Sequence, residues 1–205
     1  MTVDQRRSIV EWGSAGAALE GEDESGDVHV VAAFPGGALV AVIDGLGHGT
    51  EAAAASKEAA RVLERHASEP LSDLVERCHE ALRYTRGAVM SIASFSRDGS
   101  MSWIAIGNVE AILLRAGPAA DPRRETIALR GGVVGYQLPA LRPSAITVSR
   151  GDTLVMATDG IRSGFIADLD VKGTPQEIAD SILARFARGT DDALVVVARY
   201  AGAAP

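Results

Sequence analysis

The chain has 205 residues, of which 47% are hydrophobic and 23% are charged, and its formal net charge at pH 7 is −7. This length and apolar content suffice to bury one sizeable core, so we expect a single domain over residues 1–205. The negative charge argues against nucleic acid or an anionic membrane as a partner, because both favour clustered lysine and arginine.

The cysteine content and the pattern of apolar residues indicate the cellular compartment in which the protein is expected. Cys78 is the single cysteine, so no disulfide can form within the chain. No apolar run approaches the roughly 18 residues of a membrane-spanning helix. Residues 1–7 are not followed by the apolar core of a signal peptide. We therefore expect a cytoplasmic protein, with a monomer as its expected state.

The first third of the chain predicts strands and one acidic loop. Strands are expected over residues 8–18 and 28–34, separated by the acidic, glycine-bearing segment 20–27. A third apolar strand ends at Asp44 and runs into a loop with three further glycines, Gly45, Gly47 and Gly49. If the second and third strands form a hairpin through residues 35–37, Asp27 reaches the end of the strand that carries Asp44.

The pattern then changes to a helical period. Apolar residues recur at helical spacing from Thr50 and again after Pro70, which predicts two helices. Residues 89–95 and 100–106 flank Asp98-Gly99, a strong hairpin signal. Further strands are expected over residues 109–114, 125–129, 145–149 and 152–157. A third helix is predicted to begin at Thr174-Pro175-Gln176-Glu177, a capping box with proline at the first helical position.

The connections between the expected strands decide the fold class. They are too short for crossover helices, so the sheets should be largely antiparallel. About ten strands, with helices at two points in the chain, fit two packed sheets covered on their outer faces. The sequence therefore predicts an α+β fold, a four-layer αββα sandwich of two largely antiparallel sheets flanked by helices.

Acidic residues stand at the ends of three apolar strands. Asp44 and Asp159 each end a strand and are followed by glycine, and Asp191 and Asp192 precede another. A lone Asp-Gly after a strand is usually a turn, but three such ends meet at one sheet edge if the strands are antiparallel neighbours. Each carboxylate pair about 4 Å apart would repel by about 4 kcal/mol at an effective dielectric constant near 20. Such a cluster would have to bind protons or cations.

The available ligand atoms favour hard divalent cations. Carboxylate, carbonyl and water oxygens suit Mg²⁺ or Mn²⁺ rather than zinc. A zinc site is not expected, because Cys78 stands alone and the four histidines show no short ligand spacing. Those histidines are His29, His48, His66 and His79.

The acidic motifs resemble, in order and context, those of the metal-dependent (PPM, type 2C) serine/threonine phosphatases. They read Asp44-Gly45-Leu46-Gly47-His48-Gly49, Ala157-Thr158-Asp159-Gly160-Ile161 and Asp191-Asp192-Ala193-Leu194. Within that family, the compact length and the segment 131–136 are most similar to the RsbX-type feedback phosphatases of the bacterial stressosome. The SpoIIE and RsbU branch is the next nearest.

The resemblance implies a site with two Mn²⁺ or Mg²⁺ ions. Asp44 would bridge the ions, the Gly45 carbonyl would ligate one, and Asp159 and Asp191 would ligate the other. Asp27 matches a Ser-Gly-Asp motif whose acid orients the attacking water, so the expected catalytic residues are Asp44 and Asp27. The implied substrate is a phosphoserine or phosphothreonine protein, with STAS-domain stressosome proteins as the suspected partners. The resemblance leaves Asp192 as a neighbour of the ligands and His48 as a residue that shapes the loop.

The chain also departs from the broader family. Gly107-Asn108-Val109 stands where many members have Gly-Asp-Ser, so an extra metal site that uses that acid is not expected. The segment 20–27 holds no arginine for the phosphate contact of larger relatives. We therefore expect the grip on the substrate to depend on the folded surface of the partner.

Two alternatives stay open. Residues 44–47 also resemble the Asp-x-Gly-x-Gly nucleotide loop of histidine-kinase-like ATPases, including anti-sigma kinases. In those proteins an asparagine-bearing helix precedes the loop, whereas strands are expected before Asp44. The second alternative is a catalytically inactive docking module that keeps the sandwich, against which the retention of all three candidate acidic motifs counts.

Overall fold

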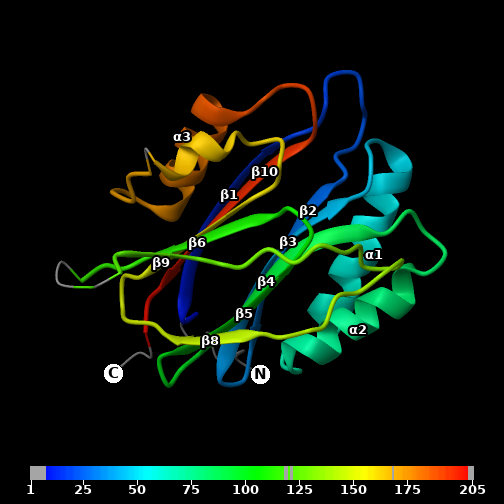
Figure 1. Ribbon diagram of the computed structural model, residues 1–205. Coiled ribbons are helices and arrows are strands. Elements are labelled where there is room, and N and C mark those ends of the chain that lie inside the picture. The colour runs from blue at the N-terminus through cyan, green and yellow to red at the C-terminus, as the bar shows by residue number, and fades with distance from the viewer. Residues whose placement is uncertain (1–7, 118–119, 121, 168, 203–205) are drawn as a thin grey trace, which may run out of the picture.

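The computed structural model describes residues 8–117, 120, 122–167 and 169–202 (Figure 1). Its first sheet has the order β2 (Asp27–Phe34), β3 (Gly37–Gly45), β4 (Ala88–Ser96), β5 (Ser100–Ile106) and β8 (Ser144–Thr147). Its second sheet has the order β1 (Val10–Ala17), β10 (Ala193–Tyr200), β9 (Thr153–Ala157), β6 (Glu110–Leu114) and β7 (Arg124–Thr126).

The helices cover the outer faces of the two sheets. The helices α1 (Thr50–His66) and α2 (Leu71–Leu82) lie on the first sheet, and α3 (Pro175–Phe186) lies on the second with the short 3₁₀ helix η1 (Ser163–Ile166) (Figure 1). Neighbouring strands in both sheets pair antiparallel. The predicted α+β four-layer sandwich is confirmed. Among the described residues, no helix has the length and apolar content needed to cross a membrane.

Two of the predicted strands are shorter than expected. β7 ends at Thr126 and β8 at Thr147, whereas the sequence predicts strands to residues 129 and 149. The pairing with β6 stops soon after β7. The Ile127 N–H still donates to the Ala111 carbonyl of β6, but the Arg130 carbonyl accepts from the Gly107 N–H, which lies before β6. Residues 127–143 carry the chain from one sheet to the other, which a continuous apolar pattern does not reveal.

The two central strands are buried on both faces, which explains their unbroken apolar sequence. In β3, Val40 and Val42 face the second sheet, while Leu39, Ala41 and Ile43 pack under α1 and α2. β10 follows the same alternation, because its side chains pack alternately between the sheets and against α3. The two strands that adjoin the acidic motifs, β3 and β10, are therefore held in place by packing on both of their faces.

Small side chains bring α1 close to the first sheet. Ala52, Ala55 and Ala59 are fully buried, and a Cβ added to Gly45 would lie 2.2 Å from the Ala52 carbonyl oxygen. Glycine at position 45 is thus required by the first turn of α1. This contact fixes where the helix begins relative to the end of β3.

The third helix begins as predicted. The Thr174 hydroxyl accepts from the Glu177 backbone N–H at 3.2 Å, and the Glu177 carboxylate accepts from the Thr174 N–H at 2.8 Å. Pro175 occupies the first turn. The capping box is confirmed, and it sets the start of the helix that covers the second sheet.

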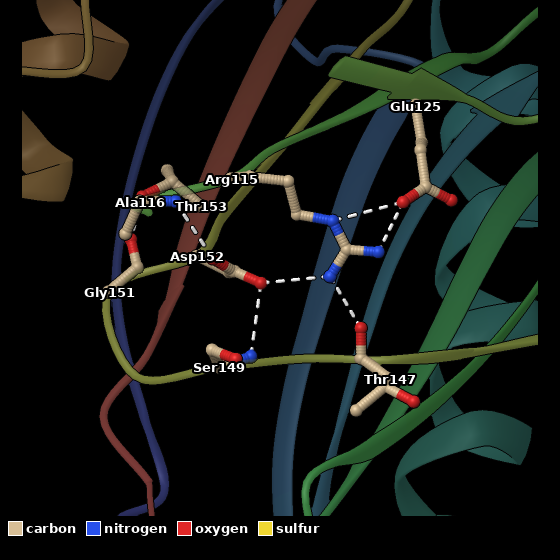
Figure 2. Close-up of polar contacts among 8 residues, drawn as sticks. All are labelled: Arg115, Ala116, Glu125, Thr147, Ser149, Gly151, Asp152 and Thr153. Carbon is tan, nitrogen blue, oxygen red and sulfur yellow. Dashed lines mark hydrogen bonds and ion pairs between the residues drawn. The ribbon is translucent and has the colours of Figure 1, made fainter. Parts of the chain in front are cut away.

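An ion-pair network holds the sandwich at the end of β6 where Leu114 lies, and Figure 2 shows it. Arg115 donates to the Glu125 carboxylate at 2.9 Å through Nε and to the Asp152 carboxylate at 2.9 Å through Nη1, and Nη1 also contacts the Thr147 carbonyl. Asp152 is 1% exposed and also accepts from the backbone N–H groups of Ala116 and Ser149. One guanidinium therefore joins β7, β8 and the turn before β9.

The buried thiol of Cys78 provides a test of how α2 packs. Cys78 is 0% exposed, and burial raises the pKa of its thiol to about 12. Because the thiolate is the reactive form, we expect the native protein at about pH 8 to react with a disulfide reagent about 100-fold more slowly than the urea-unfolded protein. Equal labelling rates in the two states would contradict the packing of α2.

Candidate metal centre

Two acidic side chains face each other at one end of the β2–β3 hairpin. Asp27 lies directly opposite Asp44 in the antiparallel register, as the predicted hairpin requires. Burial, which is the largest cause, acts together with the neighbouring carboxylates to raise the pKa of Asp44 to about 8 and that of Asp27 to about 7, although the hydrogen bond from Thr158 lowers the pKa of Asp27. Like charges in directly opposed positions are destabilising, so this pair favours a bound proton or cation at neutral pH.

The second sheet brings two more acids to the same edge. β9 ends two residues before Asp159, and β10 begins two residues after Asp191. Since Ala157 lies opposite Val195, these antiparallel neighbours place both acids at one end of the sheet. Asp44, Asp159 and Asp191 all line a cleft of ≈ 310 Å³. The structure thus joins three sequence positions that are more than 30 residues apart.

Among the described residues, neither Asp27 nor Gly45 lines this cleft. Asp27 is half-buried beside Asp44, and its Oδ2 accepts from the Thr158 hydroxyl at 2.7 Å. The same hydroxyl accepts from the Leu194 N–H at 2.9 Å, so Asp27 of the first sheet is bound to the second. The backbone N–H of Gly45 donates to the Gly26 carbonyl at 3.1 Å.

Asp192 anchors the loop that precedes β2. Its Oδ1 accepts from the Leu19 N–H at 2.8 Å, and its Oδ2 accepts from the Gly26 N–H at 2.7 Å. The residue is 4% exposed, whereas Asp191 beside it is exposed. The two adjacent acids therefore have different surroundings, and only the first faces the cleft.

Two polar contacts shape the mouth of the cleft. Asn108 donates from Nδ2 to the Asp159 carboxylate at 2.6 Å. His48 Nδ1 lies 2.5 Å from Glu22 Oε1, which links the glycine-rich loop to the acidic loop before β2. This contact agrees with the loop-shaping role expected for His48.

The donor set of the cleft fits a hard divalent cation. The acids supply oxygen ligands, and they lie close enough together for each to disfavour ionisation of Asp44. Within the described part of the chain, no group of three His, Cys, Asp or Glu side chains could hold one ion as the side chains stand. An ion here would take part of its ligands from backbone carbonyls and water, as Mg²⁺ commonly does.

Sequence reasoning did not assign roles to Thr158, Asn108 or Asp192. Each acts through a contact with a residue distant in sequence, from 51 positions for Asn108 and Asp159 to 173 for Leu19 and Asp192. The sequence offers only local signs of these roles. Thr158 directly precedes the Asp159-Gly160 pair, and Asn108 follows Gly107, which has a positive φ of 92°.

Comparison with known proteins identifies the family. The family model for Stage II sporulation protein E (SpoIIE) matches residues 35–201, which include Asp44, Asp159 and Asp191. The chain belongs to the SpoIIE family. It is thus a member of a serine/threonine phosphatase family, and the predicted resemblance to the PPM phosphatases is confirmed.

Known relatives support this assignment. The phosphoserine phosphatase RsbX of Bacillus subtilis (strain 168) is 29% identical over 166 residues, which are 80% of this chain and 81% of RsbX. A chain in a structure described as the bacterial stressosome, a modular system adapted to control secondary messenger signalling, is 32% identical. It aligns with a TM-score of 0.85 over 93% of this chain and 99% of that chain.

More distant solved structures share the fold. RsbX in complex with magnesium has a TM-score of 0.81 at 24% identity, over 93% of this chain and 94% of that chain. The catalytic domain of the phosphatase PstP in complex with two manganese ions has a TM-score of 0.68 at 18% identity, over 93% and 97% of the two chains. Members of the family thus bind Mg²⁺ or Mn²⁺, as these two structures show.

The different surroundings of Asp191 and Asp192 provide a prediction. Asp192→Asn replaces an acceptor of two backbone N–H groups and should lower the free energy of unfolding by about 1–3 kcal/mol. The matched variant Asp191→Asn should leave that free energy nearly unchanged, because Asp191 is exposed. Urea unfolding of the metal-free proteins measures both values. A larger loss for Asp191→Asn would contradict the anchoring role of Asp192.

Proposed function

We propose that this protein is a phosphoserine/phosphothreonine protein phosphatase whose cleft holds two Mn²⁺ or Mg²⁺ ions. The observation that supports it is the meeting of carboxylates from two sheets at one cleft, beside the glycine-rich loop. In this proposal Asp44 would contact both ions, the Gly45 carbonyl would help to hold one, and Asp159 and Asp191 would help to hold the other. When bound, the ions lower the pKa of water and neutralise phosphoryl charge.

The protein residues then have distinct tasks. Asp27 orients the attacking water, because its Oδ2 is fixed by Thr158 while the carboxyl remains beside Asp44. Asn108 holds the Asp159 carboxylate in place. Phosphoryl transfer depends mainly on positioning and charge stabilisation, so no protein nucleophile is needed. The buried Cys78 on α2 is consistent with this.

We further infer a role as a feedback phosphatase of stressosome signalling. The support is the similarity to RsbX and to the stressosome chain described above. The substrates would be phosphorylated STAS-domain proteins, and the enzyme would act as a cytoplasmic monomer of one domain. Release of phosphate from purified phosphorylated STAS-domain proteins, compared with unrelated phosphoproteins, tests this assignment.

The nucleotide-binding alternative fits the local structure less well. Histidine-kinase-like ATPases carry an asparagine-bearing helix before the glycine loop, whereas β2 and β3 precede Asp44 here. That alternative also gives no role to Asp159 and Asp191. The inactive docking module is disfavoured, because the chain belongs to a phosphatase family and Asp44, Asp159 and Asp191 all line one cleft.

Replacement of Asp44 tests the proposed metal site. Asp44→Asn should reduce Mn²⁺-dependent hydrolysis of p-nitrophenyl phosphate by about 1,000-fold, because the bridging carboxylate is lost. The matched variant Asp98→Asn, in the exposed β4–β5 turn, should retain wild-type activity. Full activity of Asp44→Asn would refute the assignment of this residue.

Metal binding should also stabilise the folded chain. A ligand at free concentration c that binds only the native state stabilises it by RT ln(1 + c/Kd), so the melting temperature rises with the logarithm of the ligand concentration once that concentration exceeds Kd. We expect Mn²⁺ to raise the melting temperature of the wild type after treatment with chelator, and to raise that of Asp44→Asn much less. Calorimetry with and without the metal measures the difference. Identical shifts in both proteins would place the binding elsewhere.

A further inference from the structure

One wall of the cleft is built from two turns that are joined by backbone hydrogen bonds. Ala88 and Val134 exchange two such bonds, at 3.0 and 2.9 Å, so the segment after α2 lies against residues 133–137. The Leu46 N–H donates to the Gly87 carbonyl at 3.1 Å, which ties the same wall to the glycine-rich loop. Val133 lines the cleft from this wall. The wall is therefore continuous with the proposed catalytic site.

Two tyrosines project from this wall into solvent. Tyr84 is 99% exposed and Tyr136 is 83% exposed. In the described part of the chain, four large hydrophobic side chains are exposed, and two of them are these tyrosines. The backbone around both is fixed, because Tyr136 donates to the Val133 carbonyl and Thr85 donates to the Leu82 carbonyl. The exposed aromatic groups thus stand on ordered turns beside the cleft.

The Arg86 side chain reaches the glycine-rich loop from the turn that also carries Tyr84. The Arg86 guanidinium Nη1 is 2.8 Å from the point where a Cβ on Gly47 would lie, and Gly47 lines the cleft. The Arg86 Nε forms an ion pair of 2.5 Å with Glu51 at the start of α1. Arg86 Nη1 therefore lies beside a residue that lines the cleft, and the cleft itself is lined by three aspartates.

We propose that Tyr84, Arg86 and Tyr136, here called the tyrosine rim, form the docking surface for the folded phosphoprotein substrate. The proposal rests on the phosphatase function above. A phosphoserine side chain is short, so a protein whose phosphoryl group enters the cleft must lie against the surface beside it. Tyr and Arg are the residue types that contribute most binding energy at such surfaces, and tyrosine loses little entropy on contact.

The decisive experiment compares a large substrate with a small one. A phosphorylated STAS-domain protein contacts the rim, whereas p-nitrophenyl phosphate reaches only the cleft. For the double variant Tyr84→Ala/Tyr136→Ala, the ratio of kcat/KM on the phosphoprotein to kcat/KM on p-nitrophenyl phosphate should fall by about tenfold or more. Arg86→Gln should lower the same ratio. The thermal melting temperature of each variant shows that the fold is kept.

The matched control removes an exposed aromatic side chain elsewhere. Trp12 is 46% exposed on β1 of the other sheet, and Trp12→Ala should leave the ratio at its wild-type value. An unchanged ratio in the double variant overturns the docking surface, as does an equal loss on both substrates. Dimers of the wild type that dissociate in the double variant would assign the rim to a second copy of the chain, and also overturn it.

The outcome separates the two proposals. A wild type with no Mn²⁺-dependent hydrolysis of p-nitrophenyl phosphate contradicts the proposed function itself. A wild type that hydrolyses both substrates, together with rim variants that do the same at an unchanged ratio, contradicts only the docking surface.

Discussion

The site depends on hydrogen bonds that hold the two sheets together where their acidic ends meet. Five carboxylates, those of Asp44 and its four acidic neighbours, lie at this edge and repel one another, and that repulsion opposes the packing of one sheet on the other. Thr158 at the end of β9 donates to Asp27 of β2, and Asp192 before β10 accepts from Gly26 before β2. Both bonds cross between the sheets at the edge where the repulsion acts. They keep the carboxylates at one edge without neutralising Asp44, Asp159 and Asp191, which line the cleft.

The position of the acids follows from the burial of the strands that carry them. β3 and β10 are covered on both faces, so their backbones cannot shift without disturbing two layers of packing. Asp44 lies at the end of β3, Asp191 lies just before β10, and Asp159 lies just beyond β9, which is also packed on both faces. The Arg115 network holds β6 and its neighbours at their other end.

Much of this arrangement could be predicted from the sequence. The apolar runs ending in Asp44 and Asp159, the hairpin that places Asp27 opposite Asp44, and the capping box at Thr174 all arise from local patterns. The contacts that complete the site do not, because Thr158 and Asp27 are 131 positions apart and neither residue type is distinctive by itself. The ends of β7 and β8 were missed for a similar reason, since they depend on where the chain crosses between sheets.

The cleft and the tyrosine rim would recognise different parts of a substrate: the cleft its phosphoryl group, and the rim its folded surface. The acids and the glycine-rich loop suit ions and a phosphoryl group, which every phosphoprotein presents alike, so they offer little basis for choosing among substrates. Selectivity must then come from surface outside the cleft. The bond from Leu46 to Gly87 fixes the glycine-rich loop to the turn that bears Tyr84 and Arg86. A protein seated on the rim would therefore hold its phosphoserine at a fixed offset from Asp44, which makes correct docking a condition for correct placement of the phosphorus.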